Sequence, residues 1–97
     1  MTFIYVIAPE TGNTVKIGYS EDPEARLKQL QTGHPQQLKL IHTEEVDDCV
    51  ARAIEQKIHV ANSSLRLKGE WFSMSVEQAK DEIIFARITY GEDPLLR

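Results

Sequence analysis

The sequence predicts a small α+β domain with a mostly antiparallel sheet. Two observations lead to this prediction. Segments 3–8 and 14–19 are rich in β-branched and aromatic residues and flank a loop of turn-forming residues, which is typical of a β-hairpin. Later segments repeat apolar residues at the spacing of a helix. The chain has 97 residues, enough for one hydrophobic core, so we expect a single domain over 1–90 and a flexible tail over 91–97.

A third strand is predicted over 38–42, where apolar and polar residues partly alternate. Pro35 precedes it and favours an extended chain. Further on, 65–73 contains the run Gly69-Glu70-Trp71-Phe72 and is predicted to be a loop that leads into a short extended segment. The order of elements is therefore strand, strand, helix, strand, helix, short segment and helix.

The first and last helices are predicted from their capping residues. Asp22 can accept hydrogen bonds from the first free amides of a helix, and Pro23 suits its first turn. Gly33 is expected to end this helix. Ser75, with a glutamine three residues later, forms a capping box before a helix predicted over 76–89.

The middle helix, predicted over 46–62, has two unlike faces. At 100° per residue, one face is apolar and the opposite face carries a narrow polar stripe. The stripe comprises Asp48, Arg52, Glu55, His59 and Asn62. Two interpretations remain open: a solvated face with ion pairs between successive turns, or a row of functional groups.

Composition excludes several classes of protein. The longest apolar run, 3–8, is too short to span a bilayer, and no positive charge beyond the amino terminus precedes it as in a signal peptide. A cytoplasmic location is therefore the default expectation. One cysteine excludes an internal disulfide and a thiolate zinc cluster. The five glycines form no phosphate-binding loop, and the three histidines lack metal-site spacing.

The net charge of −4 is not typical of a nucleic-acid-binding protein, but the charge is unevenly distributed. Segment 52–68 contains four basic residues and one acidic residue, which gives +3. This stretch predicts a local basic surface, and the alternative is an ordinary solvated one. The basic residues are Arg52, Lys57, Arg66 and Lys68.

Six residues are informative only through their spacing: Tyr5, Lys16, Gly18, Arg26, Glu55 and His59. Phe3-Ile4-Tyr5, then Lys16-Ile17-Gly18, then Arg26 and a helical Glu55, resembles the GIY-YIG nuclease superfamily. Segments 5–7, 16–20, 23–27, 55–59 and 69–72 are similar to its small phage-type DNA-binding branch, which has meiotically up-regulated fungal relatives. The resemblance covers about residues 3–75.

The resemblance implies a three-stranded antiparallel sheet flanked by helices, with both tyrosine-type motifs at the centre of the hairpin. It also implies an endonuclease that hydrolyses DNA phosphodiester bonds with Mg²⁺ or another divalent cation. By position, Tyr5 would be the general base or a water-orienting phenol, Arg26 would hold the scissile phosphate, and Glu55 would bind the metal. Lys16 could supply the cation that a tyrosine base needs near neutral pH.

The wider set of candidates follows from the same resemblance and from the local charge. Lys16 joins the catalytic residues, and His59, Glu70 and Ser20 are candidate auxiliary residues. The DNA-binding candidates are Lys16, Arg26, Arg52, Lys57, Arg66 and Lys68. The sequence departs from the family pattern at two positions, because Phe3 stands where glycine is usual and Lys16 replaces the second tyrosine.

Other functions and structural roles remain open. The chain could be a non-catalytic DNA- or protein-binding module, such as a phage-type regulator, or a small interaction domain that uses Trp71-Phe72. Tyr5 could simply pack in a strand, and Lys16 could protect an edge strand. The remaining structural alternatives are an Arg26–Asp22 pair, a helix-end charge at His59 and a salt bridge from Glu70. No membrane partner is expected, and the oligomeric state stays open.

Overall fold

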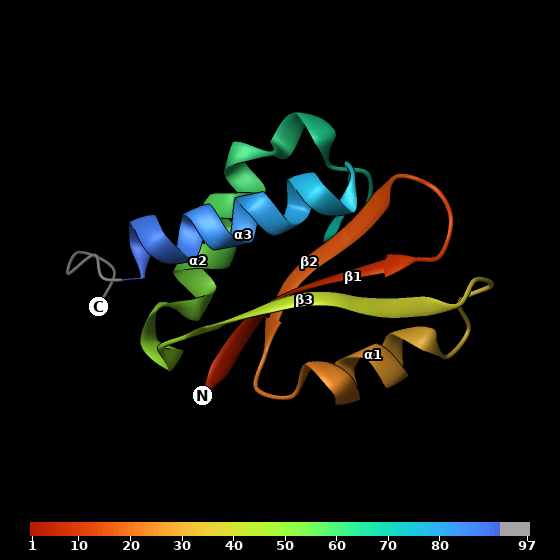
Figure 1. Cartoon of the computed structure of the whole chain (residues 1–97), viewed down its shortest axis with the longest axis horizontal. Coiled ribbons are helices and arrows are strands. Elements are labelled where there is room, and N and C mark those ends of the chain that lie inside the picture. Colours follow the sequence, from red (N-terminus) through yellow and green to blue (C-terminus); the bar gives the residue numbers. More distant parts are fainter. Residues whose placement is uncertain (92–97) are drawn as a thin grey trace.

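The structure is a computed structural model that describes residues 1–91. The predicted α+β class is confirmed (Figure 1). In chain order the elements are β1 (Thr2–Pro9), β2 (Thr14–Ser20), α1 (Pro23–Gln31), β3 (Leu38–Val46), α2 (Asp48–Ala61), a 3₁₀ turn (Ser63–Leu65), β4 (Trp71–Ser73) and α3 (Val76–Tyr90). Gly91 follows α3 as its C-cap, and the rest of the predicted tail, 92–97, lies outside the described residues.

The sheet has four antiparallel strands in the order β3-β1-β2-β4, whereas the resemblance implied three. The additional strand is the short extended segment, which pairs with Thr14–Lys16 of β2. Three residues are too few to show alternation, and their partner lies more than fifty positions earlier, so this pairing is not visible in the sequence pattern.

The third strand is longer than expected because it continues through the acidic residues Glu44 and Glu45. These two residues pair with Ile4 and Phe3 of β1. β3 is an edge strand, where charged side chains are tolerated and hinder pairing with other chains. As a result, α2 begins at Asp48 rather than at 46.

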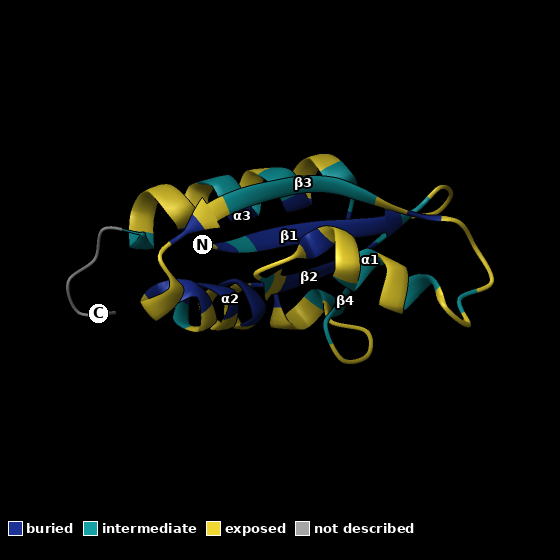
Figure 2. Ribbon diagram, turned by 90° about the horizontal axis from the view of Figure 1, so that it is seen from below, coloured by how far each residue is buried: buried dark blue, intermediate teal, exposed yellow. Residues whose placement is uncertain are grey.

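Each face of the sheet packs against its own helices (Figures 1 and 2). On one face, side chains such as Ile4 and Ile17 form the main core with α2 and α3. On the other, Tyr5 and Ile7 form a smaller cluster with Leu27 of α1. This division follows from the alternation of side chains along a strand.

The predicted helix caps are present. The Asp22 carboxylate accepts a hydrogen bond from the Ala25 amide at 3.1 Å, and the Ser75 hydroxyl accepts one from the Gln78 amide at 3.1 Å. Within residues 1–91 no helix is long and apolar enough to cross a membrane.

Candidate functional site

The two hairpin motifs lie side by side at the centre of the sheet. Tyr5 of β1 is paired with Gly18 of β2, and the Tyr5 side chain is 1% exposed. A Cβ atom at Gly18 would lie 2.7 Å from Cζ of Tyr5 and 3.0 Å from Oε1 of Glu70. Gly18 therefore lets the Tyr5 phenol and the Glu70 carboxylate approach the backbone of β2. A glycine inside a strand is the signal for such a close approach.

Gly18→Ala is expected to destabilise the fold, because a methyl group would displace Tyr5 and Glu70. Overpacking of this kind costs about 1–3 kcal/mol, and each kcal/mol lowers Tm by roughly 4–8 °C in a domain of this size. Thermal denaturation measures the effect. Phe in place of Tyr5 removes the hydroxyl beside the new methyl, so part of the loss should be recovered in the Gly18→Ala/Tyr5→Phe double variant. Equal losses with and without the hydroxyl would show that the strain arises elsewhere.

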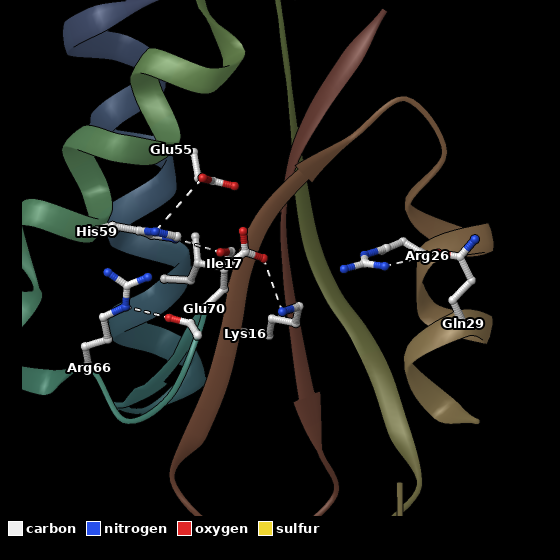
Figure 3. A network of polar contacts seen from close by, with 9 residues as sticks. Lys16, Ile17, Arg26, Gln29, Glu55, His59, Arg66 and Glu70 are labelled. Carbon is white, nitrogen blue, oxygen red and sulfur yellow. Dashed lines mark hydrogen bonds and ion pairs between the residues drawn. The ribbon is translucent and has the colours of Figure 1, made fainter. Parts of the chain in front are cut away.

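Lys16 and Glu70 form an ion pair beside these motifs (Figure 3). The Lys16 Nζ atom lies 3.1 Å from Oε1 of Glu70. Lys16 is buried, and β2 is flanked by β1 and β4, so Lys16 does not protect an edge strand. Glu70 therefore forms a salt bridge, which was the structural alternative to a role in the site.

Arg26, rather than Lys16, is the cation that acts on the pKa of Tyr5. Burial raises the pKa of the Tyr5 phenol above its usual value of 10, and a side-chain hydrogen bond with Arg26 opposes that rise. The phenol is consequently protonated near neutral pH. Arg26 extends from α1 toward the strands and also donates to Gln29 Oε1 at 3.1 Å (Figure 3). Asp22 caps the Ala25 amide and does not pair with the Arg26 side chain.

Glu55 and His59 project from α2 toward the edge of β2 beyond the end of β4 (Figure 3). Their exposures are only 7% and 8%, so the solvated interpretation of the polar stripe is wrong for this half of the helix. The His59 Nε2–H group donates to the Ile17 carbonyl at 2.8 Å, and His59 Nδ1 lies 4.0 Å from Oε1 of Glu55. This half of the stripe is buried against β2, where His59 satisfies a backbone carbonyl of a strand far away in the sequence.

The Glu55 carboxyl group is held in a state that favours taking up a cation or a proton. Burial, followed by the negative charge of Glu70, raises the pKa of Glu55 to about 7. Oε2 of Glu55 is buried and has no hydrogen-bond partner among the described residues. Such an oxygen is costly to keep unpaired, so it marks this carboxyl as a candidate ligand.

The residues around Glu55 fit a magnesium ion with few protein ligands. No cluster of three or more Asp, Glu, His or Cys side chains suited to a metal occurs within residues 1–91. Mg²⁺ keeps several waters and is commonly bound through one or two carboxylates plus substrate phosphate. Glu55 would be the main ligand, and Glu70 is the nearby second carboxylate.

The other predicted residues are distributed unequally around this site. Arg66 lies in it, because it lines an open pocket of about 330 Å³ together with Glu55, His59 and Glu70. Lys57 lies outside the site, because its ammonium is 4.9 Å from the centre of the Tyr90 ring, against α3. Arg52 and Lys68 are exposed, and the Ser20 hydroxyl accepts a hydrogen bond from the Asp22 amide at 3.0 Å.

Comparison with known families matches the chain to the T5orf172 domain over residues 2–87. The chain belongs to the T5orf172 domain family. The matched range contains every residue of the candidate site described above, from Tyr5 to Glu70. Searches among curated proteins and among solved structures give no match.

Proposed function

We propose that this T5orf172 domain is a GIY-YIG-type DNA-binding domain that hydrolyses phosphodiester bonds with a divalent cation, Mg²⁺ in the first instance. The observation that carries the proposal is the convergence of side chains on Tyr5, whose phenol and the Glu70 carboxylate both approach β2 at Gly18. Arg26, Glu70 and Glu55 all influence the pKa of its phenol, so groups from α1, the loop before β4 and α2 act on one point of the hairpin. Clusters of perturbed titratable groups are typical of functional sites.

Each side chain has a role that suits its state. Because the Tyr5 phenol is protonated near neutral pH, water orientation is favoured over general-base catalysis. The Arg26 guanidinium, next to that phenol, would bind the scissile phosphate and stabilise its developing charge. Glu55 would hold the cation, which polarises the phosphate and stabilises the leaving oxygen when bound. The ion pair with Glu70 would fix the position of Lys16 beside the phosphate.

Nicking of supercoiled plasmid tests the proposal. We expect wild-type protein to convert the plasmid to the open circle with Mg²⁺ or Mn²⁺, and not with EDTA. DNA binding without nicking in any divalent ion would instead indicate the non-catalytic DNA-binding module. Absence of both would leave a protein-binding domain.

The position of the DNA can be tested through Arg66. Arg66→Gln is expected to weaken DNA binding and to lower the slope of log affinity against log salt by about 0.9 for duplex DNA, the effect of one lost phosphate contact. Lys57→Gln is the matched control, since it removes the same charge from the α3 side of α2. Fluorescence anisotropy at several salt concentrations measures both slopes. If the two variants shift the slope equally, the DNA does not lie over the Glu55 pocket.

A further inference from the structure

A second pocket lies at the other end of the hairpin, between the loop after α1 and the loop before β4. Its volume is about 390 Å³, within the range of ligand sites. His34, Pro35 and Gln36 line it from the first loop, and Leu67 and Trp71 line it from the second side. Its lining is thus mainly planar rings and apolar side chains.

Both walls of this pocket are held by hydrogen bonds. The Gln31 side chain donates to the Gln36 carbonyl at 2.9 Å and accepts from the Leu38 amide at 2.7 Å, which ties together the loop after α1. On the other wall, the Leu67 amide donates to the Trp71 carbonyl at 2.9 Å. The pocket is therefore largely formed before any ligand arrives, which lowers the cost of binding.

Two aromatic rings of the lining are stacked, and a cation lies beside one of them. The His34 and Trp71 rings are stacked, with centroids 5.8 Å apart and planes inclined by 28°. The Lys16 Nζ atom lies 5.8 Å from the centre of the Trp71 ring while it is paired with Glu70. Lys16 thus joins this pocket to the candidate site around Tyr5, Glu70 and Glu55.

We propose that this pocket binds one unpaired nucleobase of the DNA strand whose phosphate occupies the site, an inference that rests on the proposed function. A nucleotide combines a planar ring with a phosphate, and here stacked rings adjoin a buried lysine. Aromatic side chains stack on any base, and only an unpaired or flipped base exposes its faces. The domain would then prefer single-stranded, branched or mismatched DNA over a continuous duplex.

Trp71 makes this proposal directly observable, because it is the only tryptophan of the chain. The probes are a 12-mer of oligothymidylate, an abasic strand with the same number of phosphates, and a 12-bp duplex, all in EDTA. We expect the oligothymidylate to quench Trp71 fluorescence and to bind about 5- to 100-fold more tightly than the abasic strand, as expected for one stacked base. The duplex should bind without comparable quenching.

Two exposed apolar residues provide a matched pair of variants. Leu67 is 58% exposed in the pocket, and Phe85 is 61% exposed on α3 outside it. Leu67→Ser should reduce the preference for bases over abasic strand, and Phe85→Ser should not, although neither is expected to disturb the fold. Equal binding of oligothymidylate and abasic strand, with unchanged fluorescence, would overturn the base pocket and leave the nuclease proposal intact. Failure of all three probes to bind in anisotropy would overturn the proposed function itself.

Discussion

Glu55→Gln should abolish metal-dependent nicking and leave DNA binding intact. The amide keeps the shape of the carboxyl but loses the charge that a divalent cation needs. Loss of a cation that stabilises the transition state costs several kcal/mol, so we expect a decrease on the order of 10²–10³-fold or more. DNA affinity should hold or rise slightly, since a negative charge leaves the pocket. Nicking and anisotropy measured on one preparation provide the comparison, and retained Mg²⁺-dependent nicking would remove Glu55 as the ligand.

The same variant also distinguishes a site residue from a structural one. The pKa of Glu55 is raised to about 7, above its ordinary value of 4.5, so between these values the folded state binds more protons than the unfolded state. The contribution of Glu55 to stability therefore falls as pH rises through this window and stays low above it. In EDTA, Glu55→Gln should raise Tm relative to wild type at pH 8 and by less at pH 5. A lower Tm at pH 8 would favour a structural role.

Tyr5→Phe is expected to decrease nicking by about 10²–10⁴-fold, the usual effect of losing one proton-transfer or water-orienting group. The ring remains in its buried position, so the fold and the DNA affinity should change little. Tyr19→Phe is the control, because Tyr19 lies on the same hairpin but is exposed. Activity of Tyr5→Phe equal to that of Tyr19→Phe would exclude a catalytic phenol.

Local features were readable from the sequence. The hairpin segments, the Asp22 and Ser75 caps and the three helices could be predicted because each depends on residues within a few positions of one another. The spacing of Tyr5, Arg26 and Glu55 also indicated candidates for a site.

Features that depend on distant segments could not be read in this way. The solvated interpretation of the polar stripe failed at His59 because its partner is a carbonyl 42 positions away. The Lys16–Glu70 pair likewise requires β4 to dock on β2. Periodicity indicates which face of a helix is polar, but not whether that face meets water or another backbone.

The shortness of β4 has a consequence for self-association. β4 pairs only with Thr14–Lys16, and the next residue of β2 is completed by other groups: the Ile17 amide donates to the Glu70 carbonyl at 3.1 Å, and the Ile17 carbonyl accepts from His59. Unsatisfied strand edges recruit other chains and promote aggregation. His59 thus covers a segment of the β2 strand edge that would otherwise be open to pairing with another chain. This role of His59 does not depend on any chemistry at the neighbouring site.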